Sequence, residues 1–130
     1  MKYVVLIHSN PEPWGHPTGA HVAAYQALPA EERSRRDAAF EELLTELQGN
    51  GELVGGEALG DPGTATLYRE EAAEVLVTDG PYSELKEHLA GFFLIDVADR
   101  ERAEEVARQF ASPGDTVELR PAMWPGGGDD

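Results

Sequence analysis

Apolar residues along this chain form short continuous runs and helically spaced stripes, which together predict a domain of mixed α and β structure. The run from Tyr3 to Ile7 is rich in β-branched residues and predicts a buried strand. The run from Phe92 to Val97 predicts another. Shorter strands are expected over residues 52–59, 65–69 and 74–78, and a last one over residues 116–122.

Two amphipathic helices are expected between these strands. The first begins after Pro29, a residue that suits a helix start, and Asp99 is a natural N-cap for the second. Their apolar faces are Phe40, Leu43, Leu44 and Leu47 in the first helix, and Ala103, Val106, Ala107 and Phe110 in the second. A short third helix is predicted over residues 83–89. Gly55-Gly56 indicates a bulge or a close backbone approach inside a strand.

The order of elements is strand, helix, strand, hairpin, strand, helix, strand. Without the hairpin this is βαββαβ, so we predict an α+β, ferredoxin-like fold in which two helices cover one face of an antiparallel sheet. Residues 1–124 are expected to form a single domain, since 130 residues suit one core. Residues 125–130, with the sequence PGGGDD, are expected to be a disordered tail.

The first strand and the Phe92 strand are apolar on both faces, although two helices can cover only one face of a sheet. Large exposed apolar patches are rare on monomers, so the other face needs a cover. A second copy packed sheet to sheet is the simplest cover, and we predict a homodimer. The alternative is that the loop over residues 9–29 and the inserted hairpin fold over the sheet.

Charge narrows the range of partners. The chain has 25 acidic and 10 basic residues, a formal net charge of -15. Such a surface repels nucleic-acid backbones and anionic membranes, and it is compatible with a small-molecule ligand or a basic protein. Cysteine is absent, which excludes disulfides, thiol catalysis and cysteine-ligated metals. No run resembles a secretory leader or a membrane span, so a cytoplasmic protein is expected.

The histidines of the first loop raise the question of a metal. His8, His16 and His21 lie within 14 residues, but their spacing matches no standard metal motif. We therefore expect loop histidines and no metal. No redox cofactor is expected either.

Several segments resemble the YCII-related proteins, specifically the branch named for an Asp-Gly-Pro-Phe motif. They are ELVGGEAL, TLYR, VTDGPYSELKEHLAGFFLIDV and VELRPAM, and the motif reads Asp79-Gly80-Pro81-Tyr82 here. The resemblance covers roughly residues 1–124. It implies dimeric α+β barrels of ferredoxin-like subunits, in a family whose members mostly have no known activity. One relative dehydrochlorinates an aromatic substrate, and some proteins of the branch are linked to extracytoplasmic-function sigma factors.

Compact members of that family carry a proposed His–Asp pair, with the histidine early in the first helix. The comparable stretch here, SRRDAAFEELL, contains no histidine. Asp79 is thus either a general base or a turn residue that accepts backbone N–H bonds. His8, at the end of the first strand, is its candidate partner or a plain strand terminus. We name Asp79 and His8 as the candidate catalytic pair.

Candidate substrate-binding residues are Tyr3, Trp14, Tyr82, Lys86 and His88. Trp14 is a large aromatic residue in a loop, which needs something to pack on, while Lys86 could bind an anionic group or simply be solvated. Two functions stay open. One is an enzyme that uses acid–base chemistry on a small substrate, such as an aromatic compound, in a pocket of the dimer. The other is a non-catalytic binding or regulatory protein associated with a sigma factor.

Overall fold

The computed structural model of this chain describes residues 1–82 and 85–123. Its strands are β1 (Lys2–Ser9), β2 (Leu53–Ala58), β3 (Thr66–Glu71), β4 (Glu74–Asp79), β5 (His88–Asp96) and β6 (Thr116–Pro121). Its helices are α1 (Ala23–Gln26), α2 (Ala30–Gly49) and α3 (Arg100–Phe110), with short 3-10 turns η1 (Thr18–His21) and η2 (Pro62–Thr64). The presence of both helices and antiparallel strands confirms an α+β fold.

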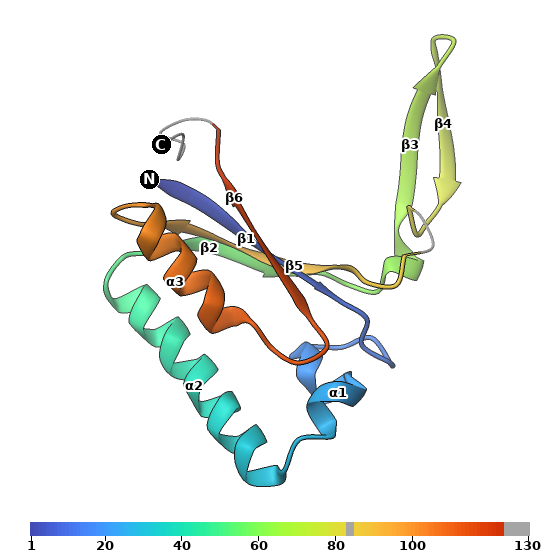
Figure 1. Ribbon diagram of the computed structural model, residues 1–130. Coiled ribbons are helices and arrows are strands. Elements are labelled where there is room, and N and C mark those ends of the chain that lie inside the picture. The colour runs from blue at the N-terminus through green and yellow to red at the C-terminus, as the bar shows by residue number, and fades with distance from the viewer. Residues whose placement is uncertain (83–84, 124–130) are drawn as a thin grey trace.

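A four-stranded antiparallel sheet in the order β2-β5-β1-β6 forms the body of the molecule. The two longest apolar runs, β1 and β5, are its central strands, because only central strands have neighbours on both sides. Figure 1 shows α1, α2 and α3 together on one side of this sheet.

The core lies between the sheet and the helices α2 and α3. Alternate residues of β1 and β5 point into it, among them the fully buried Tyr3, Val5 and Ile95. From the helices come Leu43, Leu47, Ala103, Val106 and Phe110. The Phe110 ring stacks on Phe93 with 4.6 Å between centroids. Both predicted helical faces therefore supply core residues, although Phe40 stays 37% exposed.

The other face of the sheet, which we call the open face, carries Val4 and Leu6 of β1 and Phe92 and Leu94 of β5. The register places them in two cross-strand rows, Leu6 opposite Phe92 and Val4 opposite Leu94. All four side chains are only half-buried. The apolar character of both faces was predicted, and Figure 1 shows no helix on the open face.

The inserted hairpin, strands β3 and β4 over residues 66–79, forms a separate two-stranded sheet that we call the arm. Figure 1 shows that the arm extends away from the four-stranded sheet, on the side opposite to the helices. Tyr68, Val75 and Val77 on the arm are 68%, 63% and 57% exposed. Within this chain the arm does not fold over the sheet, contrary to the alternative considered for covering that face.

Several local predictions can be checked. Asp99 caps α3, since its carboxylate accepts a bond of 2.9 Å from the Arg102 N–H. A bulge or a close backbone approach was predicted at Gly55-Gly56. The β2–β5 register is irregular between Leu53 and Gly55, and a Cβ on Gly56 would lie 2.5 Å from the Phe92 backbone oxygen, so the backbones approach closely there. The helix predicted over 83–89 is wrong where it is described, because residues 85–87 are not helical and β5 begins at His88. Residues 83–84 and the predicted tail, 125–130, lie outside the described residues.

Candidate functional site

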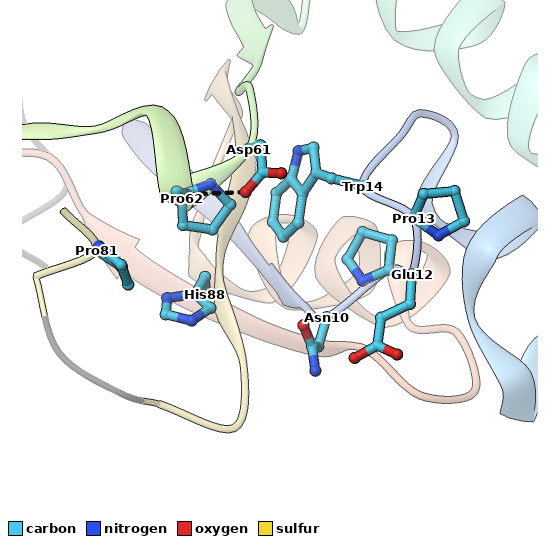
Figure 2. A pocket seen from close by; sticks show the side chains of 10 residues that line it. Asn10, Glu12, Pro13, Trp14, Asp61, Pro62, Pro81 and His88 are labelled. Atoms are coloured by element: carbon cyan, nitrogen blue, oxygen red, sulfur yellow. Dashed lines mark hydrogen bonds between the residues drawn. The ribbon is translucent and has the colours of Figure 1, made fainter.

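A cavity of about 390 Å³ lies where β1 ends and β5 begins. Its volume is within the range of small-molecule sites. Figure 2 shows Trp14, Asn10, Asp61 and His88 around it. The full lining is Asn10, Pro11, Glu12, Pro13, Trp14, Asp61, Pro62, Gly63, Pro81 and His88.

The loop that follows β1 is held to the sheet through Asp115. One oxygen of its carboxylate accepts the hydroxyl of Ser9, and the other accepts the Thr18 hydroxyl at 2.8 Å. Ser9 is fully buried, so this bond satisfies a donor that water cannot reach. The start and the middle of the loop are thereby fixed to the segment before β6.

Trp14 is positioned by a hydrogen bond to the end of β2. Its indole N–H donates to the Leu59 carbonyl at 2.9 Å, and the His16 ring N–H donates to the same oxygen at 2.7 Å. Leu59 itself donates to Ala90 of β5 at 2.8 Å. An indole held at its polar atom keeps its apolar ring free to pack, so Trp14 forms a fixed aromatic wall of the cavity.

The residues that flank the arm in sequence supply another wall of the cavity. Asp61 accepts the Gly63 N–H at 2.8 Å and so begins η2, as short polar side chains do at turn starts. A single residue, Ala65, separates η2 from the arm, and directly after the arm Gly80 donates to the Ala65 carbonyl at 2.6 Å. Pro62 and Pro81, on either side of the arm, both line the cavity.

His88 is the histidine of the cavity. It is the first residue of β5, its Cα lies opposite that of Ser9, and its side chain is half-buried. No hydrogen bond joins its imidazole to any other residue in the described ranges. A half-buried imidazole with both ring nitrogens available can bind a ligand through one nitrogen and exchange a proton with it.

The structure places the predicted substrate-binding residues in three different surroundings: the cavity, the core and the exposed surface. Trp14 and His88 line the cavity together. Tyr3 lies in the core, with the Arg100 guanidinium 5.8 Å from its ring centroid. Tyr82, which is 82% exposed, and Lys86, also exposed, are not part of the cavity lining.

The proposed catalytic pair is not formed within one chain. The His8 ring donates to the Glu118 carboxylate at 2.9 Å, across the β1–β6 pair on the open face. Asp79 ends β4 at the root of the arm, opposite Thr66, and no other described residue hydrogen-bonds its carboxylate. Neither residue lines the cavity.

Asn10, Asp61 and the prolines of the cavity were not singled out from the sequence. The only signal was local, because Asp61-Pro62-Gly63 has the composition of a turn. That such a turn meets the end of β1 depends on the β1–β5–β2 pairing, which composition does not reveal.

Across residues 1–82 and 85–123, no three His, Asp or Glu side chains gather as a metal site would require. None of the helices described there is long and apolar enough to cross a membrane.

Within the part of the chain that the structure describes, fold and cavity define an α+β protein with one sheet face that no helix covers and a small pocket at the end of its central strands. The chain belongs to the YCII-related domain family, whose family model matches residues 1–121. It is also similar to an uncharacterized protein of Rhizobium meliloti (strain 1021), with 40% identity over 60 residues. That alignment covers 44% of this chain and 48% of the relative, so the similarity spans about half the length of either protein.

Proposed function

We propose that this chain is a homodimeric, ferredoxin-like member of the Asp-Gly-Pro-Phe branch that binds a small, flat organic molecule against Trp14. The order β2-β5-β1-β6, with the hairpin inserted between β2 and β5, supports the ferredoxin-like assignment. The uncovered apolar residues of the open face support a second copy, packed sheet to sheet as in a dimeric barrel.

The observation that carries the binding proposal is the cavity itself. An indole fixed at its N–H stands in one wall, several proline rings add apolar surface, and His88 supplies a polar group without a hydrogen-bond partner among the described residues. Binding sites of this type combine apolar walls with a few polar groups that orient the ligand. A planar ligand would stack on Trp14 and hydrogen-bond to His88.

A more specific version of this proposal is that the bound molecule is a substrate and that the chain catalyses an acid–base reaction on it. Within one chain, His88 is the candidate base, because it lines the cavity and has both nitrogens available. His8 lies on the open face and Asp79 at the root of the arm. These two residues would act as a pair only where two copies bring the open face of one against the arm of the other.

A regulatory role associated with a sigma factor is the second candidate. The net charge of -15 favours it, since an acidic surface attracts basic protein segments. In that case ligand binding in the cavity would modulate a protein contact, and no substrate would be consumed.

The intrinsic fluorescence of Trp14 can report ligand binding in the cavity. The chain has two tryptophans, Trp14 and Trp124, so a Trp124→Phe protein has a single indole, which lies in the cavity. A panel of small aromatic acids, amines and neutral heterocycles is screened by thermal shift and by Trp14 fluorescence. A true ligand should raise the midpoint and change the fluorescence together.

Matched variants then locate the site. His88→Gln should weaken a ligand about tenfold or more through loss of its polar contact, while His8→Gln and Asp79→Asn should leave its affinity within about twofold. Equal effects of all three variants, or a panel without any hit that responds to His88, would refute the site. Turnover of a bound compound, lost in His88→Gln, would separate the enzyme from the regulator.

A further inference from the structure

We propose that the arm clasps a second copy of this chain, seated on the open face, and that this contact holds one wall of the cavity in place. The inference rests on the proposed dimer but goes beyond it, because sheet-to-sheet packing does not require the arm. It starts from the exposure of the arm, whose strand β4 has no buried residue over its whole length.

The arm has one face suited to a protein contact. Cross-strand pairing puts Tyr68 beside Val77 and Glu70 beside Val75 on the same face, since opposite residues in an antiparallel pair share a face. The other face carries the Arg69–Leu76 pair and the glutamates nearest the turn. Three of the arm's four exposed large apolar side chains, Tyr68, Val75 and Val77, share this face, and the fourth, Leu76, lies on the other. A lone two-stranded ribbon is marginally stable without packing, so this exposed apolar face indicates a partner.

The position of the arm points to a second copy as its occupant. Figure 1 shows the arm extending on the side of the sheet opposite the helices, which is the side of the open face. A molecule seated on Val4, Leu6, Phe92 and Leu94 would therefore stand beside the arm. In a two-fold pair each subunit supplies both surfaces, so both uncovered surfaces of this chain are used at once.

Size supports the same conclusion. With strands about 4.8 Å apart and residues about 3.3 Å apart, a four-stranded face six residues long spans roughly 400 Å² in plan. A stable interface buries about 800 Å² per partner. The two-stranded arm would extend the plan area of this face by roughly half and so enlarge the contact.

Charge is compatible with this contact. Lys2 and Arg120 lie on the same side of the sheet as Val4, at the end where β1 starts. Lys2, together with Arg120, whose guanidinium also lies 3.8 Å from the Glu118 carboxylate, offers positive charge to Glu70 of the second copy's arm in a strongly acidic chain. The contact itself is expected to be chiefly apolar.

Contact between the arm and a second copy would also affect the rigidity of the cavity wall. The arm begins two residues after Thr64, the end of η2, and its last residue is followed by Gly80 and Pro81. Pro62, Gly63 and Pro81 belong to the cavity wall, so a partner that immobilises the arm immobilises that wall.

Hydrogen exchange of the unaltered protein gives the first test. Amides of residues 66–79 should exchange at least about tenfold more slowly above the dimer dissociation constant than below it. Sedimentation velocity on the same samples reports the dimer independently. A dimer whose arm amides exchange equally fast at both concentrations refutes the clasp and leaves the dimer standing. A monomer at every concentration refutes both.

Variants give the second test. Tyr68→Thr combined with Val75→Thr and Val77→Thr keeps strand-forming side chains while removing the apolar face, and Leu76→Thr alters the opposite face as a control. The triple variant should weaken the dimer about tenfold or more, and the control less than about threefold. Equal dimer affinities of the triple variant and the control would overturn the proposal.

Discussion

The amide of Gly80 lies 2.6 Å from the carbonyl oxygen of Ala65, and this bond joins the two ends of the arm at its root. A Cβ built on Gly80 would lie 2.6 Å from the Ala65 Cβ and 2.9 Å from its carbonyl oxygen. The approach therefore requires glycine. In the Asp-Gly-Pro segment, Gly80 closes the arm and Pro81 lines the cavity.

Gly80→Ala should therefore loosen the root of the arm. If the arm stays closed around the added methyl group, we expect the free energy of unfolding to fall by about 1–3 kcal/mol, as at other overpacked sites. If the root of the arm opens instead and relieves the clash, residues 66–79 should show faster hydrogen exchange. Gly55→Ala is the control, since no atom lies within 4 Å of the added methyl group. Identical exchange in both variants would contradict the close-packing role of Gly80.

The ion pair between Glu52 and Arg102 predicts a dependence of stability on pH. The Arg102 guanidinium donates to the Glu52 carboxylate at 2.7 and 3.0 Å, and this bonding lowers the pKa of Glu52 below its ordinary 4.5. A carboxyl with a lowered pKa stabilises the fold above its unfolded value, and that contribution disappears as the pH falls through the folded value.

Glu52→Gln should consequently cost about 1–3 kcal/mol at pH 7 in urea unfolding, with the difference shrinking below about pH 4. The side chains are 16% and 21% exposed, so solvent screens this pair only partly. Glu104→Gln breaks the exposed pair with Arg100 and should cost less than about 0.5 kcal/mol. A pH-independent loss in Glu52→Gln would rule out the ion pair as its cause.

The phenol of Tyr25 is expected to lose its proton at a higher pH than an ordinary tyrosine. Burial, and then its hydrogen bond to Asp37, raise the pKa of Tyr25 to about 12 from an ordinary 10.0. Because the folded value is the higher one, the contribution of Tyr25 to stability is complete below pH 10 and is lost toward pH 12.

Ultraviolet titration of the phenolate checks this. The difference between the wild type and Tyr25→Phe should be one ionisation near pH 12, and the same step should persist in Tyr82→Phe. At pH 7, Tyr25→Phe should cost about 1 kcal/mol, the usual value of one hydrogen bond. A difference titration centred near pH 10 would show that Tyr25 is not held as described.

Asp115 should prove essential to the anchoring of the first loop. Asp115→Ala leaves the hydroxyl of the buried Ser9 without its acceptor, which should cost about 1–3 kcal/mol in urea unfolding. In a Ser9→Ala background the same change should cost clearly less, because the stranded donor is gone. Strict additivity of the two substitutions would mean that this hydrogen bond does not hold the loop.

Local periodicity predicted much of the fold. The β-branched run at Tyr3–Ile7 and the stripe containing Leu43 and Leu47 produced a strand and a helix close to their expected bounds. A short helix was predicted over residues 83–89, yet pairing with β1, in which Ser9 lies opposite His88, extends β5 back to His88. Tertiary pairing there outweighed local propensity.

The candidate site was less predictable. Trp14 and His88 were both named from the sequence, for different reasons, and only the pairing of β1 with β5 brings them to one cavity. His8 was paired in expectation with Asp79, but Glu118 is its neighbour because β6 adds to the edge of β1. Tyr3 lies in the core because odd-numbered residues of β1 face the helices.

By itself, then, the amino-acid sequence determined most of the element types and the apolar character of both sheet faces. These properties depend on backbone preferences and on spacings within about ten residues, which a linear pattern records. Only the tertiary structure decided which carboxylate meets His8, what lines the cavity beside Trp14, and where the arm extends. Those outcomes depend on contacts between residues far apart in the chain, and no local periodicity specifies them.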